Sequence, residues 1–460
     1  MKYVSTRGQA PVLAFDDVLL AGLAVDGGLY VPETWPQLDR SVLRALAGRP
    51  YVEVATEVAW PFVEGSLERD DLAAIITEAY ATFDVPEVCP LVDLGDETWL
   101  LELFHGPTLA FKDVALQVVG RLFDHVLAER GERRTVVVAT SGDTGSAAIE
   151  ACRGRDALDI VVLFPAGRIS EVQRRLMTTV PDANVRCLSV AGTFDDCQAL
   201  VKQLFGDAEL RSRLGLSAMN SMNWGRVVPQ AAYYVTSALA LGAPDRAVGF
   251  AVPSGNFGNV LSGDVARRLG LPIARLVVGT NRNDTLARFL TTGVLERSEV
   301  HATSSPAMDV SVPSNLERLL FELVARDASA LVDLMARFVE TGRVAVPPPA
   351  FEAAQAGFDA TRVDEDEVAA TMTGTLERSG VVIDPHTAVG VAAARRRRPA
   401  SGSPVVVLAT ASPAKFPEAV EAATGVHPRL PAHLSDLLDR PERVTDVGAD
   451  VDEVRAAVEG

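Results

Sequence analysis

Five short runs rich in apolar and β-branched residues alternate with small-residue turns and helical periods, and this alternation constrains the fold more than any other feature. The runs are TVVVAT at 135–140, IVVLF at 160–164, VGFAV at 248–252, IARLVVG at 273–279 and VVVLAT at 405–410. Strands that alternate with helices in this way form parallel sheets covered by helices on both faces. The predicted fold class is therefore α/β with open parallel sheets.

The length of 460 residues predicts two or three structural units, because a single core stops growing at about 250–300 residues. Residues 1–95 predict a separate N-terminal lobe, since a turn-rich strand around residues 26–32 precedes amphipathic helical stretches that end before Pro86. Residues 300–370 interrupt the strand and helix alternation. A long helical stretch over 316–338 and a run of three prolines predict an inserted helical segment there.

The composition excludes several classes of protein. The formal charge of −18 repels nucleic acid phosphates and anionic membranes over long distances. The N-terminus lacks the apolar segment of a signal peptide, and no apolar run of about 18 residues could span a bilayer. The four cysteines are too scattered for a disulfide framework. We expect a cytoplasmic protein that binds neither nucleic acid nor membrane and holds any anionic ligand at a local site.

Several catalytic motifs are absent from the sequence. G-x-S-x-G, H-E-x-x-H, G-x-x-x-x-G-K and G-x-G-x-x-G do not occur, and the six histidines have no metal-ligand spacing. These absences argue against a serine hydrolase, a zinc enzyme, a P-loop kinase and a nicotinamide dehydrogenase.

Two strand-to-helix turns have the composition of anion sites. In VPSGNFGN at 252–259, two glycines let the backbone approach a ligand closely, and the free N–H groups of a helix start suit a phosphate. The second turn, ATSGDTG at 139–145, offers backbone N–H groups and three hydroxyls to a carboxylate or a phosphate. Taken alone, each turn is also compatible with a purely structural, capped helix start.

Lys112 is one of only four lysines, and it precedes a predicted helix over 114–122. Such a lysine usually extends to water. Near apolar groups and a helix N-terminus, however, its neutral amine is favoured, which a Schiff-base nucleophile requires. Together the lysine and the two turns match the aldehyde and phosphate of a cofactor and the carboxylate of an amino acid. We therefore predict pyridoxal 5'-phosphate as the cofactor.

With these motifs the chain resembles the threonine synthases, in their longer form with an N-terminal extension. The matching stretches keep the family's order over nearly the whole chain, and they are DGGL at 26–29, LELFHGPTLAFKD at 101–113, ATSGDTG at 139–145, NSMNWGR at 220–226, VPSGNFGN at 252–259, TNRNDTL at 280–286, PAMDVSVPSN at 306–315 and TASPAKF at 410–416.

The resemblance implies the fold of type II pyridoxal-phosphate enzymes, in which the cofactor lies between two domains with open parallel sheets. The large domain would comprise residues 96–135 and 245–460, including the insertion at about 300–370. The small α/β domain would comprise residues 136–244.

The resemblance also assigns the cofactor site. Lys112 would form the Schiff base and then move protons between carbons of the substrate. Thr410 would face the pyridine nitrogen, where a neutral hydroxyl leaves that nitrogen unprotonated more often than an aspartate would. The cofactor phosphate would be held by the backbone donors of Gly255, Asn256, Phe257 and Gly258.

The substrate site follows in the same way. Ser141, Asp143 and Thr144 would lie over the amino-acid end of the substrate. Asn220 and Arg226 would contact the substrate phosphate, for which the planar guanidinium of an arginine is suited. Lys415 is expected beside the cofactor ring. Ser412 stands where many members of the family have histidine, so the role of that histidine is in doubt in this chain.

The implied reaction converts O-phospho-L-homoserine and water to L-threonine and phosphate, the last step of threonine biosynthesis. Two alternatives remain open at this point. One is a threonine or serine dehydratase of the same fold, and the other is a non-catalytic, threonine-synthase-like binding protein. We expect a monomer or a homodimer.

Overall fold

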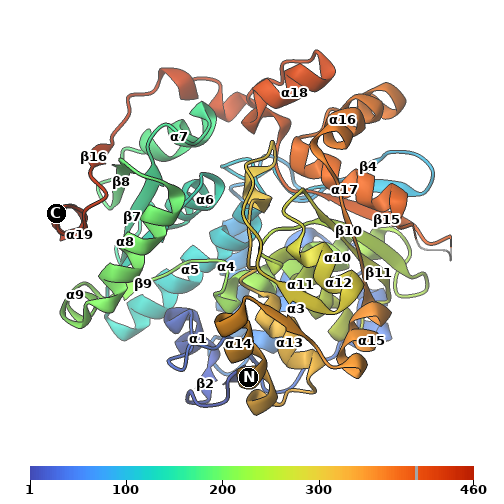
Figure 1. Cartoon of the computed structure of the whole chain (residues 1–460), viewed down its shortest axis with the longest axis horizontal. Coiled ribbons are helices and arrows are strands. Elements are labelled where there is room, and N and C mark those ends of the chain that lie inside the picture. Colours follow the sequence, from blue (N-terminus) through green and yellow to red (C-terminus); the bar gives the residue numbers. More distant parts are fainter. Residues whose placement is uncertain (399–401, 460) are drawn as a thin grey trace.

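The computed structural model describes residues 1–398 and 402–459. Two mainly parallel sheets lie side by side, and an N-terminal lobe packs against helices that border both of them (Figure 1). Among the described residues, no helix is both long and apolar enough to cross a membrane.

The large sheet has six strands in the order β14-β11-β10-β15-β5-β4. All neighbours are parallel except β4 and β5. The bounds are β4 Leu91–Asp93, β5 Thr98–Glu102, β10 Val248–Pro253, β11 Ile273–Thr280, β14 Phe358–Arg362 and β15 Val405–Ala409. Because β4 pairs with β5, residues 91–93 belong to this sheet rather than to the predicted N-terminal lobe.

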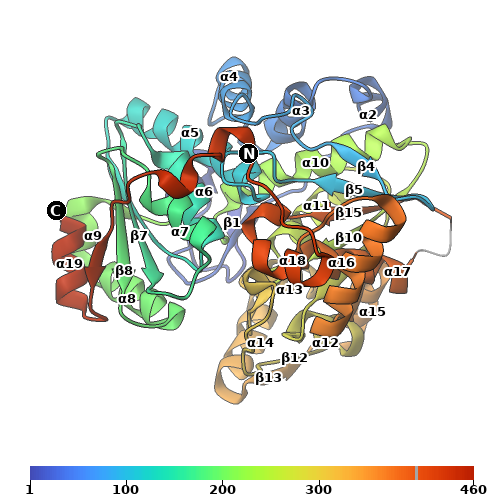
Figure 2. The same ribbon diagram turned by 90° about the horizontal axis from the view of Figure 1, so that it is seen from above.

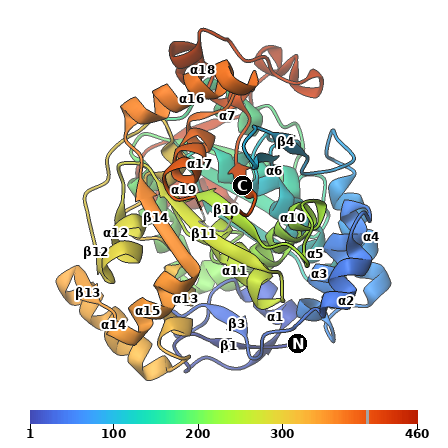
Figure 3. The same cartoon turned by 90° about the vertical axis from the view of Figure 1, so that its right-hand side faces the viewer.

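Helices cover both faces of the large sheet, as Figure 3 shows. Phe250 and Val252 face one core, whereas Ala251 between them faces another. This alternation with burial on both sides explains why the strand reads as a continuous apolar run. The helices around the sheet are α10 Val227–Ala240, α11 Gly258–Arg268, α16 Glu365–Ser379, α17 Pro385–Arg396 and α18 Pro417–Thr424.

The small sheet has five parallel strands in the order β16-β8-β7-β6-β9. Their bounds are β6 Arg134–Ala139, β7 Leu158–Pro165, β8 Val185–Val190, β9 Leu216–Ser217 and β16 Thr445–Val447. The helices around it are α5 Lys112–Arg130, α6 Asp143–Cys152, α7 Glu171–Thr178, α8 Phe194–Gly206, α9 Ala208–Leu214 and α19 Val451–Glu459.

The C-terminal segment returns to the small sheet. After α18 the chain crosses from the large domain, β16 pairs with β8, and α19 packs on α8 (Figure 2). The prediction placed all of residues 245–460 in the large domain. The structure differs because β16 is a strand of three residues whose pairing with β8 has no local sequence signal.

The N-terminal lobe consists of a three-stranded antiparallel sheet and four helices. The elements are β1 Lys2–Ser5, β2 Leu13–Ala14, α1 Phe15–Ala21, β3 Tyr30–Pro32, α2 Arg40–Leu46, α3 Tyr51–Val63 and α4 Arg69–Tyr80. Helix α3 packs on α10, and α4 packs on α5.

The inserted segment is helical, but not as one long helix. It contains α13 Leu316–Leu323, α14 Ala328–Thr341, β13 Arg343–Ala345 and α15 Pro348–Gly357. It follows α12 Thr285–Thr292 and β12 Val294–Glu296, and β12 pairs with β13. The predicted helix over 316–338 is interrupted, because Ala325 and Arg326 have positive φ angles of 55° and 62°. Arg326 donates a hydrogen bond of 2.6 Å to the carbonyl of Pro32 from this turn. A contact with the N-terminal lobe thus accompanies the break.

Candidate active site

The predicted turn 254–258, residues 410–416 and Lys112 lie near the carboxyl ends of neighbouring parallel strands. Turn 254–258 follows β10, and residues 410–416 follow the adjacent strand β15. The N–H of Phe111 donates to the carbonyl of Thr410, with a distance of 2.9 Å, which places the Lys112 segment beside β15. The carboxyl edge of an open parallel sheet is the usual position of a ligand site.

Lys112 is the first residue of α5, and it is 9% exposed. The loop before it is fixed by Asp113, whose carboxylate accepts hydrogen bonds from the backbone N–H (2.8 Å) and the hydroxyl (2.6 Å) of Thr108. A Cβ on Gly106 would lie 2.5 Å from the Cβ of Asp113, so only glycine fits there. Gly106, Thr108 and Asp113 therefore fix the loop that positions Lys112.

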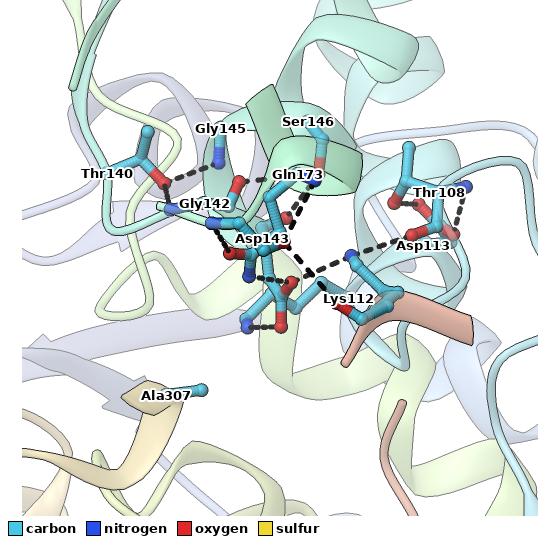
Figure 4. A network of polar contacts seen from close by, with 12 residues as sticks. Thr108, Lys112, Asp113, Thr140, Gly142, Asp143, Gly145, Ser146, Gln173 and Ala307 are labelled. Carbon is cyan, nitrogen blue, oxygen red and sulfur yellow. Dashed lines mark hydrogen bonds and ion pairs between the residues drawn. The ribbon is translucent and has the colours of Figure 1, made fainter. Parts of the chain in front are cut away.

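A buried carboxylate joins two lysines at the centre of the site. Asp143, in the first turn of α6, lies 3.1 Å from Nζ of Lys112 through Oδ2 and 2.7 Å from Nζ of Lys415 through Oδ1. Gln173 also donates to Oδ1, at 2.8 Å. Figure 4 shows Asp143 between Lys112 and the turn that contains Thr140 and Gly142.

These neighbouring charges shift the pKa values of Asp143 and Lys112. Burial raises the pKa of Asp143, but the two ammonium groups outweigh burial and hold it well below its usual range. Burial lowers the pKa of Lys112, and the positive charges of Lys415 and Arg226 act in the same direction, against the pull of Asp143. The free amine of Lys112 is therefore more available than that of an ordinary lysine.

The turn after β6 presents backbone donors next to this cluster. Its own geometry is fixed by the hydroxyl of Thr140, which accepts from the N–H groups of Gly142 (3.0 Å) and Gly145 (2.9 Å). Among the described residues, the N–H groups of Ser141, Asp143 and Thr144 have no hydrogen-bond acceptor. Three free donors at a helix N-terminus suit a carboxylate.

The turn after β10 also presents free backbone N–H groups. Within the part of the chain that the structure describes, the backbone N–H groups of residues 255–258 find no acceptor. Phe257 has a φ of 64°, which turns the chain into α11. A Cβ on Gly255 would lie 2.9 Å from Cα of Met308 and 3.0 Å from the carbonyl oxygen of Ala307. These consecutive donors fit the phosphate of pyridoxal phosphate.

Thr410 and Ser412 follow β15. Thr410 is 7% exposed, and its carbonyl accepts from the N–H of Phe111. The hydroxyl of Ser412, where the family often has histidine, accepts from the N–H of Ala414 at 3.3 Å and caps the short helix Pro413–Lys415. Ser412 thus has a local structural contact.

The loop at 220–226 contains a buried arginine. Arg226 is 4% exposed, and burial lowers its pKa to about 10. Nη1 donates a weak hydrogen bond of 3.4 Å to the carbonyl of Met219, whereas the buried Nε has no partner. No carboxylate of the described residues lies within ion-pair distance of Arg226. The amide Oδ1 of Asn220 accepts from the N–H of Met222.

The N-terminal lobe holds this loop in place. The ring of Trp224 packs against Tyr3, Phe62 and Trp35, with centroids 5.9–6.1 Å apart, and its Nε1 donates to the hydroxyl of Tyr3 at 3.1 Å. Arg318 is 1% exposed and stacks over Trp224. Arg318 donates to the carbonyl of Tyr30 in the lobe at 3.0 Å and to the carbonyl of Met222 in the loop at 2.7 Å. It also donates to Oδ1 of Asn315 at 2.6 Å.

Asn315 connects the loop with the turn after β10. Its amide donates to the carbonyl of Ser221 at 2.9 Å, and its N–H donates to the carbonyl of Asn256 at 3.1 Å. The structure therefore joins turn 254–258 to loop 220–226, and Lys112 to turn 139–145 and to the β15 end.

Sequence reasoning missed several contributors. Gln173 and Arg318 have no motif that marks them, because their roles come from contacts with residues far along the chain. Lys415 was expected beside the cofactor ring, but its pairing with Asp143 was not foreseen. His386 is a further contributor, because the backbone N–H of Ala307 donates to its Nε2 at 3.3 Å and its Nδ1 lies 2.7 Å from Oδ2 of Asp384.

Comparison with known proteins identifies the family of the chain. The family described as pyridoxal-phosphate dependent enzyme matches residues 89–411, more than half of the chain. The fold and site thus define a pyridoxal-phosphate enzyme of fold type II.

More specific matches lie on either side. The threonine synthase N terminus matches residues 2–80, and the C-terminal region of threonine synthase matches residues 387–458. Threonine synthase of Pseudomonas aeruginosa is 49% identical, with 100% of this chain and 98% of that protein covered.

Solved structures give the same result. The PLP-bound threonine synthase of Brucella melitensis superposes with a TM-score of 0.98 at 53% identity, covering 100% of this chain and 98% of that one. The yeast threonine synthase has a TM-score of 0.95 at 39% identity, with 100% and 98% covered. The chain belongs to the threonine synthase family, and it is a pyridoxal-phosphate-dependent lyase of threonine biosynthesis.

Proposed function

We propose that this enzyme converts O-phospho-L-homoserine and water to L-threonine and phosphate. The observation that carries the choice of substrate is Arg226, a buried guanidinium without a carboxylate partner among the described residues. An unpaired buried charge is costly. A substrate phosphate supplies the missing counter-charge, and the free Nε can donate to it in the planar geometry that arginine and phosphate share.

The other predicted contacts are proposed on the basis of their free donors. The N–H groups of residues 255–258 hold the cofactor phosphate, and those of Ser141 and Thr144 hold the substrate carboxylate. The hydroxyl of Thr410 faces the pyridine nitrogen. Asn220 assists Arg226 at the substrate phosphate. We also propose three units for the chain, namely the N-terminal lobe and the two sheet domains, with residues 445–459 assigned to the small domain.

Lys112 moves the protons of the reaction. The bound cofactor supplies the aldehyde that joins the substrate amine and a conjugated system that stabilises negative charge on the substrate carbons. Lys112 removes the α-proton and then a β-proton, and it returns one proton at Cγ after the phosphate has left. Water then adds its hydroxide at Cβ, the second proton returns to Cα, and the remaining proton of the water goes to the released phosphate. A single amine can serve these neighbouring carbons in turn, and its lowered pKa lets it act as a base near neutral pH.

The leaving phosphate needs a counter-charge, and the reacting groups need protection from bulk water. Arg226 neutralises the leaving phosphate as negative charge accumulates on it. Burial of Lys112, Asp143 and Arg226 keeps bulk water from these groups until one water adds at Cβ. The chain's charge of −18 opposes an anionic substrate at long range, so these local cations have to overcome it.

Arg226→Gln tests the assignment. Loss of a charge-assisted contact of about 1.5–3 kcal/mol is expected to lower kcat/KM for phosphohomoserine roughly 10- to 100-fold. Cofactor affinity, measured by titrating the visible absorbance, is expected to stay near that of the wild type. Arg213→Gln, in an exposed ion pair with Glu459, is the matched control. Lys112→Ala, which should lack the visible band, sets the background.

Two results would contradict the proposal. Equal loss of substrate and cofactor binding in Arg226→Gln would remove the arginine from the substrate phosphate site. Faster release of ammonia from threonine than of phosphate from phosphohomoserine by the wild type would indicate a dehydratase instead.

A further inference from the structure

The two lysines on Asp143 differ in how many acceptors hold their amines. Lys415 is fully buried, and its ammonium donates to the carbonyl of Thr108 at 2.8 Å as well as contacting Oδ1 of Asp143. Lys112 contacts only Oδ2, at the longer distance of 3.1 Å. Lys415 therefore has two acceptors that fix it, whereas Lys112 has one.

A buried carboxylate with a single lysine partner would oppose the chemistry of that lysine. To attack an aldehyde or to accept a proton from a substrate, Lys112 must be uncharged. If Asp143 had no other cation, deprotonation of Lys112 would leave a lone buried carboxylate, which is strongly unfavourable. A smaller fraction of Lys112 would then be uncharged near neutral pH.

We propose that Lys415 is a positioning residue that acts on Lys112 through Asp143. It stays the counter-ion of Asp143 whenever Lys112 is uncharged, so Lys112 can gain and lose a proton without leaving the carboxylate unpaired. The inference rests on the proposed function only in taking Lys112 as the reacting amine.

The geometry explains how one carboxylate can serve both lysines. Oδ1 is saturated by Lys415 and by the amide of Gln173, both at 2.8 Å or less, so Oδ2 alone is left for Lys112. The single contact orients the Nζ of Lys112 and is easily given up. With both oxygens occupied by cations, Asp143 is better suited to this role than to contact with the substrate carboxylate, which carries the same charge.

The test measures how fast the full-length chain, stripped of cofactor, acquires visible absorbance when pyridoxal phosphate is added. In this reaction the neutral amine attacks the aldehyde carbon and water leaves, so the rate follows the uncharged fraction of Lys112. In Lys415→Met, Asp143 depends on Lys112 alone. We expect the pH profile to move up by about one unit, which makes capture roughly tenfold slower at pH 7. Lys202→Met, at an exposed lysine of α8, should behave like the wild type.

A double-mutant comparison separates action through Asp143 from direct repulsion between the lysines. Asp143→Asn should move the profile to lower pH, and adding Lys415→Met to it should have little further effect. An equal shift by Lys415→Met in both backgrounds would overturn the proposal. An unchanged profile in Lys415→Met with a native circular dichroism spectrum would do the same.

A second readout does not depend on cofactor capture. With only four lysines in the chain, ¹³C-labelled lysine side chains can be titrated individually by NMR in the full chain. The midpoint of Lys112 should rise in Lys415→Met and fall in Asp143→Asn. If Lys415→Met does not fold, an unchanged midpoint in Asp143→Asn refutes the proposal by itself. If the Lys112 midpoint moved as expected in both variants but the wild-type chain never captured the cofactor, the proposed function would be refuted and this inference supported.

Discussion

Replacing Gly255 by alanine tests the proposed site of the cofactor phosphate. The added Cβ would lie 2.9 Å from Cα of Met308 and 3.0 Å from the carbonyl oxygen of Ala307. Both atoms belong to the backbone of a short helix, Pro306–Met308, which the ring of His386 holds through the N–H of Ala307. A side chain could rotate away, but these backbone atoms have to move as a segment.

The size of the effect follows from the contact distances. Carbon atoms pack at about 3.5–4.0 Å, so the turn or the short helix must shift by roughly 0.6 Å or more. Such a shift stretches a hydrogen bond of about 2.9 Å to the limit of a useful one. Loss of one charge-assisted donor costs about 1.5–3 kcal/mol, which weakens cofactor binding roughly 10- to 100-fold. Strain in the crowded contact should also destabilise the fold by about 1–3 kcal/mol.

The assay is a titration of the visible absorbance with pyridoxal phosphate, combined with urea unfolding of the cofactor-free chain. Gly206→Ala is the matched control, because a Cβ at the end of α8 would meet no atom within 4 Å. If Gly255→Ala bound the cofactor as tightly as Gly206→Ala and unfolded at the same urea concentration, the crowding argument would be refuted.

Two further predictions concern the surroundings of the site. Trp224→Phe loses the hydrogen bond to Tyr3 and part of the ring packing. The free energy of unfolding should therefore fall by about 1–3 kcal/mol in urea titrations, and the KM for the substrate should rise. Unchanged values would show that the N-terminal lobe does not support loop 220–226. Burial lowers the pKa of His105, but Glu102 and Asp84 outweigh it and raise the pKa overall. The stabilisation by His105 is therefore full below about pH 6.5 and disappears as the pH rises through the raised pKa. The stability difference between wild type and His105→Gln should accordingly be larger at pH 6 than at pH 9, and the opposite trend would exclude the ion pairs as its source.

Local sequence predicted the scaffold of the site well. All five strand runs form parallel strands of the two sheets, since a β-branched run between a helix and a small-residue turn has few other solutions. The turns at 139–145 and 254–258 lead into α6 and α11. Among the described residues, the N–H groups of Ser141, Asp143, Thr144 and residues 255–258 have no acceptor. These features depend on residues close together in the chain.

Features that depend on distant contacts could not be predicted in this way. The helix break at Ala325 is accompanied by the hydrogen bond from Arg326 to Pro32, 294 residues away. The ion pair of Asp143 with Lys415 joins residues that are separated in the sequence by loop 220–226 and by the inserted segment. The family motifs contained both residues, but nothing local showed that they would be partners.

The return of the C-terminal segment has a consequence for how the chain tolerates shortening. Without β16, strand β8 would become an outer strand with unpaired N–H and C=O groups, and Leu188 and Val190 lie along it. An uncovered strand of this kind is a template for pairing with other chains. Residues 445–459 thus replace β8 as the outer strand with β16, which has only three residues. A shortened enzyme that retained every site residue is therefore expected to self-associate more readily.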